Sequence, residues 1–171
     1  MFSKNSFLTL LFLISGVSGF SQLLDLEEKK SVMNNGMEYG YIIKNEQVKT
    51  TKGEEYGRFE ITLYISNKSG CTKIYADKSN FLSSESPNLL ATFNCNNANG
   101  KRLTSKTGTV KARDFYIPVK LTENGKEITQ TVKAGYVFRN GETLKANIIV
   151  LVPKEARPVI QCTVNSLSEL Q

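Results

Sequence analysis

Residues 57–66 alternate strictly between apolar and polar side chains, and this pattern constrains the fold more than any other feature of the chain. Four apolar residues share one parity, namely Phe59, Ile61, Leu63 and Ile65, and the residues between them are polar. Successive side chains of a β-strand point to opposite faces of its sheet. Alternation over this length therefore predicts a strand with one buried face.

Shorter alternating runs along the chain predict further strands, and Pro118 indicates an edge position or a bulge in one of them. Residues 23–36 are expected to form at most a short helical turn, which ends at Asn35-Gly36. We expect the two runs at the front of the domain to form a hairpin. The predicted strands are 39–44, 47–51, 57–66, 71–76, 89–95, 115–121, 128–138, 144–152 and 158–164.

Three Asn-Gly pairs lie between these runs, at Asn99-Gly100, Asn124-Gly125 and Asn140-Gly141. Asn-Gly tolerates the positive φ that type I′ hairpin turns require. Strands and turns in this order, without a long helical period, predict an all-β fold. We expect an antiparallel β-sandwich of about seven to nine strands, with a closed barrel as the alternative.

The N-terminus has the order of a secretory signal peptide. Lys4 precedes the apolar run 7–14, and two groups of small residues, 17–19 and 19–21, offer cleavage sites. The apolar run is too short to span a bilayer as a mature helix. The protein is therefore expected to be secreted or periplasmic, with no transmembrane segment after cleavage. An uncleaved N-terminal anchor is the alternative.

These features divide the chain into three parts. A signal peptide is expected over 1–21, a lead segment over 22–36 and a single sandwich domain over 37–171. The mature chain would have roughly 150 residues, which is enough to bury one core.

Composition excludes several chemistries. The chain has no His, which removes Ser-His-Asp and Cys-His catalysis and His-ligated zinc. Trp, a frequent platform for sugar stacking, is also absent. The acidic pairs Glu27-Glu28 and Glu54-Glu55 lie in solvated settings, so they do not resemble the carboxylates of a glycoside hydrolase. We expect no enzyme activity, no cofactor and no metal site.

Three cysteines, Cys71, Cys95 and Cys162, indicate one disulfide and one remaining thiol in an oxidising compartment. If the predicted strands 71–76 and 89–95 pair across the loop 77–88, Cys71 approaches Cys95. This disulfide would leave Cys162 as the unpaired thiol. A Cys95–Cys162 disulfide is the main alternative.

A basic stretch follows Cys95, and no acidic residue occurs before Asp114. On a hairpin around Gly108 it would form a patch for polyanions such as anionic glycans. The alternative is a set of solvated charges that protect a sheet edge. No aromatic residue interleaves these charges, so specific nucleic-acid binding is not expected. The net charge of the chain, +6, fits either interpretation. The patch residues are Lys101, Arg102, Lys106, Lys111 and Arg113.

Tyrosines on predicted strands are a second candidate surface, for sugar stacking or for a protein partner. The alternative is that they are half-buried strand formers. They are Tyr39, Tyr41, Tyr64, Tyr75, Tyr116 and Tyr136. Asn67-Lys68-Ser69 is an N-glycosylation triplet and also a turn sequence.

Three groups of turn and strand sequences share a resemblance, namely 67–71, 93–95 followed by 99–103, and 135–136 with 139–142. They resemble small secreted bacterial proteins that have an immunoglobulin-like β-sandwich and no assigned function. Strand 57–66 with its following Asn-x-Ser-Gly also resembles the second core strand of immunoglobulin-like modules. The resemblance implies an immunoglobulin-like fold and supplies no catalytic residue.

The sequence therefore favours an exported, non-enzymatic module with a binding or structural role, whose partner is an unknown envelope or extracellular protein. The alternative is carbohydrate or polyanion binding through the basic stretch and the strand tyrosines.

Overall fold

A computed structural model describes residues 22–76, 87–96, 107–123, 125–165 and 167. These residues form eleven β-strands and no helix, and every pair of neighbouring strands runs antiparallel. The all-β, antiparallel class predicted from the alternation is confirmed. The strands are β1 (Gln22–Leu26), β2 (Val32–Asn34), β3 (Met37–Thr51), β4 (Glu54–Asn67), β5 (Lys73–Ala76), β6 (Leu89–Asn96), β7 (Gly108–Lys111), β8 (Arg113–Glu123), β9 (Lys126–Phe138), β10 (Thr143–Pro153) and β11 (Val159–Val164).

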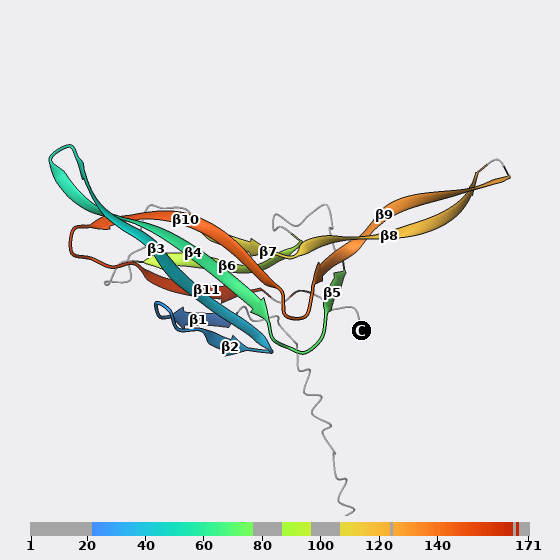
Figure 1. The fold of residues 1–171 in the computed structure, drawn as a ribbon, viewed down its shortest axis with the longest axis horizontal. Helices are drawn as coiled ribbons and strands as arrows, with labels where there is room; N and C mark the ends of the chain where they lie inside the picture. Colours follow the sequence, from blue (N-terminus) through green and yellow to red (C-terminus); the bar gives the residue numbers. More distant parts are fainter. Residues whose placement is uncertain (1–21, 77–86, 97–106, 124, 166, 168–171) are drawn as a thin grey trace, which may run out of the picture.

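The described strands are arranged in three sheets (Figure 1). The first has the order β1-β11-β6-β7, the second β10-β4-β3-β2 and the third β5-β9-β8. Buried side chains from all three sheets form one hydrophobic cluster, most of it contributed by the two four-stranded sheets. Two antiparallel sheets that share one core are consistent with a β-sandwich.

Strand β4 shows how the sequence pattern builds this core. Its four alternating apolar side chains are all buried, as predicted. Phe93 of β6 and Ile160 of β11 are buried on the opposite sheet. Gly108, the first residue of β7, allows close approach of the two sheets, because a Cβ atom there would lie 2.1 Å from Cδ1 of Leu63.

The lead segment forms strands, so the predicted helical turn is wrong. Leu24 and Leu26 are buried on one face of β1, which pairs with β11. The period-two spacing of these leucines was the signal for a strand, and pairing with a distant strand outweighed local helix preference. Asn35 and Gly36 have φ of 48° and 74°, values typical of a type I′ turn, and they connect β2 to β3.

The predicted hairpin of 39–44 and 47–51 is also wrong, because both runs belong to the single strand β3. A β-bulge lies at the end of the first run. Ile43 pairs with Ile61 and Asn45 pairs with Glu60, so Lys44 is an extra residue in the ladder. A bulge changes which residues face the core, and this explains the break in the alternating pattern.

The other predicted turns have mixed outcomes. Glu123 pairs directly with Lys126, so a two-residue connection at 124–125 is confirmed. Asn140-Gly141 connects β9 to β10, which belong to different sheets, so the hairpin predicted there is wrong. Asn99-Gly100 lies outside the described residues. The strand number exceeds the predicted seven to nine, since the lead segment contributes β1 and β2 and residues 108–111 add β7.

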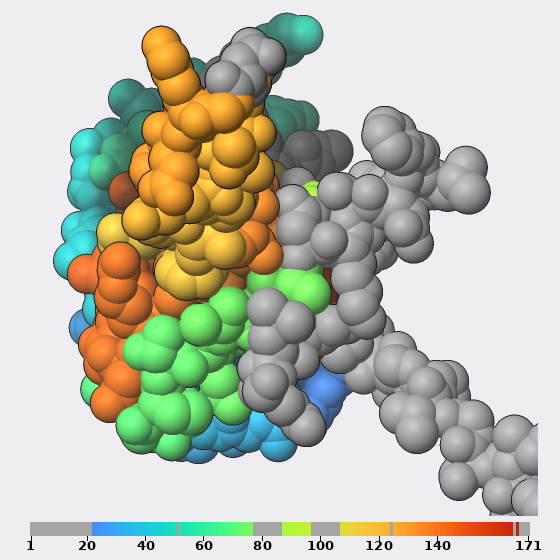
Figure 2. Space-filling view, turned by 90° about the vertical axis from the view of Figure 1, so that its right-hand side faces the viewer, coloured from blue at the N-terminus to red at the C-terminus, as the bar shows by residue number. Residues whose placement is uncertain are grey.

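The β8–β9 hairpin projects beyond the two four-stranded sheets (Figure 1). Residues 116–123 and 125–133 make up this projection and are called the arm below. In Figure 2, which faces the arm, the yellow and orange atoms of β8 and β9 stand at the front of the molecule. Most side chains of the arm are exposed.

Candidate functional site: an apolar arm and a neutral pocket

The two faces of the arm differ in chemistry. Directly opposed residues of an antiparallel pair lie on the same face. Ile117 pairs with Val132 and Leu121 pairs with Ile128, and Val119 has the same parity as Ile117 and Leu121. One face of the arm, called the apolar face below, therefore carries these five aliphatic side chains.

Much of the apolar face is open to solvent. Ile117 is 38% exposed, Leu121 41% and Ile128 40%. Isolated apolar side chains are common on protein surfaces, but a contiguous row is typical of interaction sites. The opposite face is polar and includes an ion pair between Lys120 and Glu127, with nitrogen and oxygen 3.9 Å apart. The arm is thus amphipathic.

Lys133 fixes the base of the arm. Its ammonium group lies 2.9 Å from a carboxylate oxygen of Asp114 and donates a hydrogen bond to the Tyr136 hydroxyl at 3.1 Å. The same nitrogen lies 4.2 Å from the centre of the Tyr136 ring, which adds a cation–π contact. The hydrogen bonds to Asp114 and Tyr136 raise the pKa of Lys133, so this positive charge persists at physiological pH. These contacts join β8 to the buried part of β9.

Pro118 lies in β8, the edge strand of the third sheet, as its sequence position predicted. The bulge that the sequence offered as an alternative is not present at Pro118, since the register of β8 and β9 shifts between Phe115 and Tyr116. Proline has no N–H to offer a further strand, so it blunts the free edge of the arm. The arm is therefore better suited to contacts through its apolar face than to pairing along its edge.

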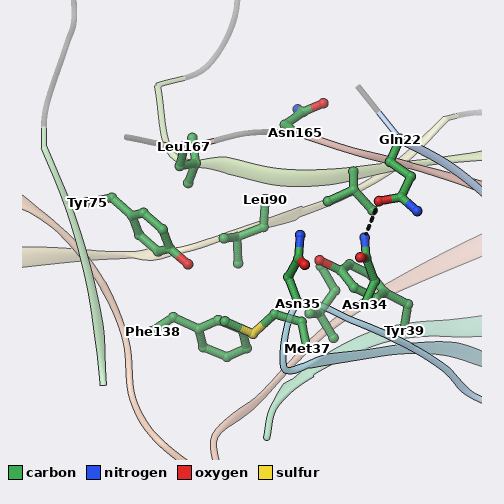
Figure 3. A pocket seen from close by; sticks show the side chains of 12 residues that line it. Gln22, Asn34, Asn35, Met37, Tyr39, Tyr75, Leu90, Phe138, Asn165 and Leu167 are labelled. Atoms are coloured by element: carbon green, nitrogen blue, oxygen red, sulfur yellow. Dashed lines mark hydrogen bonds between the residues drawn. The ribbon is translucent and has the colours of Figure 1, made fainter. Parts of the chain in front are cut away.

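A pocket of about 250 Å³ lies where the first and second sheets meet the third (Figure 3). Three aromatic side chains line it, those of Tyr39, Tyr75 and Phe138. Four amide side chains line it as well, those of Gln22, Asn34, Asn35 and Asn165. None of the lining residues is Lys, Arg, Asp or Glu.

One hydrogen bond organises the amide side of the pocket. The Nδ2 atom of Asn34 donates to Oε1 of Gln22 at 2.9 Å. Burial raises the pKa of the Tyr39 hydroxyl, which therefore stays protonated at physiological pH. The pocket lining therefore combines amide, aromatic and aliphatic side chains and includes no Lys, Arg, Asp or Glu.

The sequence did not predict this pocket, because its residues come from β1, β2, the turn after β2, β3, β4, β5, β6, β9, β11 and the segment after β11. The cluster Asn34-Asn35 was a local signal, but it was interpreted only as the end of the lead segment. Gln22 comes close to this cluster only because β1 pairs with β11. Asn165 does so because its backbone N–H donates a hydrogen bond to the Leu90 carbonyl of β6.

The predicted basic patch stays a prediction, because three of its five residues are outside the described part of the chain. Lys101, Arg102 and Lys106 lie outside the described part of the chain. Lys111 is exposed at the end of β7, whereas Nε of Arg113 lies 2.7 Å from a carboxylate oxygen of Glu142. The hairpin expected around Gly108 is wrong, because Gly108 is buried within a strand that pairs with β6.

The six tyrosines lie on strands as predicted, but they do not form one exposed surface. Tyr39, Tyr41, Tyr75 and Tyr136 are buried. Tyr116, 53% exposed, lies on the polar face of the arm. Most of these tyrosines therefore pack in the core and do not form a surface for sugar stacking. Tyr39 and Tyr75 also line the pocket.

The strand pairing that would have brought Cys71 beside Cys95 is wrong, since β5 pairs with β9 and β6 pairs with β11 and β7. No disulfide joins the three cysteines, all of which are in the described residues. Cys71 is exposed, and Cys95 and Cys162 are buried. Cys162 faces Phe93 and Cys95 faces Ile160, so the two buried thiols are diagonal neighbours. Diagonal neighbours are usually too far apart for a disulfide.

Asn67 is a structural residue that the sequence did not reveal. Its buried side chain donates to the carbonyl oxygens of Cys71 at 2.9 Å and Phe138 at 3.0 Å. Its Oδ1 accepts from the Ser69 backbone N–H at 3.0 Å and from the Ser69 hydroxyl at 2.7 Å. The amide that a glycan would need is thus engaged inside the folded protein, although the triplet is intact.

Among the described residues no group of three or more metal-ligating side chains is present. In the same part of the chain no helix is long and apolar enough to cross a membrane. Comparisons with protein family models, with curated proteins and with solved structures give no match.

Proposed function

We propose that this protein is an exported, non-enzymatic module of immunoglobulin-like type that binds an envelope or extracellular protein through the apolar face of its arm. The exposed row of Ile117, Leu121 and Ile128 is the observation that carries the proposal. A two-stranded ribbon is marginally stable in water by itself, and its exposed aliphatic side chains gain free energy when a partner covers them.

Other features support the remaining parts of the proposal. The charged start, short apolar run and small residues before Gln22 support export. Two antiparallel sheets around one core are compatible with an immunoglobulin-like sandwich. The lack of His in the chain removes the commonest acid–base and nucleophilic side-chain sets, which supports a binding role.

The attachment of the arm favours a specific contact. Lys133, Asp114 and Tyr136 link its base, and Pro118 discourages indiscriminate pairing along its edge. A surface held in place by such contacts loses less conformational freedom on binding than a loose loop. The arm therefore presents a preorganised apolar surface.

The proposal can be tested by cross-linking and affinity capture of the tagged protein after expression in its native cell. The test variant replaces Ile117, Leu121 and Ile128 with Ser. The matched control replaces three hydroxyl residues of the polar face, Thr122→Ser, Thr129→Ser and Thr131→Ser. Circular dichroism and thermal unfolding establish that both variants are folded.

We expect one protein to be enriched with the wild type and the control and to be lost with the apolar-face variant. Equal enrichment by all three proteins would overturn the assignment to the arm. Recovery of a second copy of this chain alone would show that the arm mediates self-association, which contradicts a separate protein partner.

A further inference from the structure

We propose that the pocket lined by Gln22, Asn35 and Tyr75 binds a single ring of a neutral sugar. This site is distinct from the arm and does not depend on the function proposed for the arm. Its uncharged lining, its amides and its aromatic wall each restrict the class of ligand.

The lining excludes charged ligands. It contains no Lys, Arg, Asp or Glu side chain, and the Tyr39 hydroxyl remains protonated. A carboxylate, phosphate or ammonium group would lose hydration on entry without gaining an opposite charge, which is unfavourable. The ligand is therefore neutral at physiological pH.

The amides match hydroxyl groups. Each carboxamide has an acceptor oxygen and two N–H donors, and each sugar hydroxyl both donates and accepts. After the bond between Asn34 and Gln22, the Nε2 of Gln22 and the Oδ1 of Asn34 have no hydrogen-bond partner among the described residues. The Asn35 side chain likewise makes no hydrogen bond within that part of the chain. These groups remain available to a ligand with several hydroxyls.

The opposite wall matches the apolar face of a sugar ring. Figure 3 shows Tyr75, Phe138 and Leu90 across the pocket from Asn34 and Asn35. Pyranose rings carry a face of C–H groups that packs against aromatic side chains, while their hydroxyls project around the rim. An amide rim that faces an aromatic wall can contact both parts of such a ring together.

The volume sets the size of the ligand. Pockets for drug-sized molecules measure about 300–1,000 Å³, and this one measures about 250 Å³. It accommodates one ring and its substituents and is too small for an extended chain. A terminal residue of a glycan or a free monosaccharide fits this limit.

The experiment titrates the full-length mature protein with methyl glycosides of glucose, galactose, mannose and N-acetylglucosamine. Saturation-transfer NMR detects binding, and isothermal titration calorimetry gives the dissociation constant. Glucuronic acid serves as the charged probe, and N-acetyl-phenylalanine amide represents a peptide ligand. The test variant is Gln22→Ala combined with Asn165→Ala, and the control is Gln47→Ala, an exposed amide of β3.

We expect at least one neutral glycoside to bind, with roughly tenfold weaker binding in the double variant and unchanged binding in the control. Failure of every neutral glycoside to bind overturns the inference. So does equal binding of glucuronic acid, or preferential binding of the phenylalanine amide. Changes in the backbone amide chemical shifts of the wild type on addition of the glycoside provide a readout that needs no variant. The site predicts changes near Tyr39, Leu90 and Val164. Changes only elsewhere in the protein would contradict the assignment.

Discussion

Gly108 of β7 lies so close to Leu63 of β4 that a Cβ atom on Gly108 would stand 2.1 Å from the leucine Cδ1. The same atom would lie 3.2 Å from Cγ2 of Ile148. Leu63 is fully buried, so it has little space in which to move. The close approach of the two sheets at this point therefore requires glycine at position 108.

Gly108→Ala should destabilise the protein by about 1–3 kcal/mol, because the added methyl group overpacks the core. Urea unfolding followed by circular dichroism measures the change. Leu63→Ala also destabilises the protein, because it leaves a cavity in the core. The same substitution removes the side chain with which a Cβ atom at position 108 would clash. The double variant should therefore lose less stability than the sum of the two single changes. An unchanged midpoint for Gly108→Ala would contradict the close approach.

Replacing Asn67 with Ala should be destabilising, since the buried Phe138 carbonyl loses this donor and the Cys71 carbonyl keeps only the hydrogen bond from the Ser69 hydroxyl at 3.2 Å. Each buried group left without a partner costs about 1–3 kcal/mol. Thermal unfolding gives the measurement, and Asn140→Ala, at an exposed asparagine, provides the control. Equal unfolding temperatures for the two variants would show that the hydrogen bonds of Asn67 contribute little.

Thiol reactivity should separate the three cysteines. Cys71 is exposed, whereas Cys95 and Cys162 are buried, so an aromatic disulfide reagent at pH 8 should modify one thiol rapidly in the folded protein. Three thiols should react after denaturation. Cys71→Ser should abolish the rapid phase. Fewer than three reactive thiols under denaturing, non-reducing conditions would reveal a disulfide and contradict the structure.

Stability should fall at alkaline pH. Burial raises the pKa of the Cys162 thiol from 9.0 to about 12. From pH 9 upward the unfolded chain releases this proton and the folded protein keeps it, so folding loses about 1.4 kcal/mol per pH unit from this group. Tyr39 acts in the same direction, because burial raises its pKa as well. Urea unfolding between pH 8 and 11 gives the free energy of unfolding at each pH. This free energy should fall less steeply with pH for Cys162→Ala than for the wild type. An identical pH dependence would contradict a buried thiol.

Pro118→Thr should promote self-association. The substitution restores an N–H group to the edge strand β8, and an edge with a full set of donors and acceptors can pair with another strand. Light scattering coupled to size exclusion should show a larger mass that grows with concentration. Thr131→Ser, which alters the paired strand without changing its backbone, should match the wild type.

The sequence predicted those strands in which apolar and polar residues alternate because one face contacts the core. Strand β10 is the clearest case, since Ile148, Val150 and Val152 are buried as expected. Two errors arose where distant pairing decided the structure. The charged residues after Leu26 obscured a strand that depends on β11, and the bulge at Lys44 resembled a turn.

The candidate sites were less predictable than the strands. The sequence showed that Ile117 and Leu121 share one face of a strand. It did not show that this face is exposed to solvent, because a strand with one buried face has the same alternation. Cys71 and Cys95 were placed together by assuming that consecutive strands pair, whereas β5 pairs with β9. Gln22 and Tyr75 come together in the pocket only once all three sheets have assembled.

Strand β11 lies between β1 and β6 in the first sheet, so the earliest described strand is attached to the remainder of that sheet through the last one. Such pairing between distant segments delays folding, because a long loop must close first. A growing chain must emerge through Val164 before Leu24 and Leu26 can be enclosed. A product truncated before β11 would display these leucines and an open edge of β6 to proteases. The place of this strand thus ties protease resistance of the first sheet to the synthesis of β11.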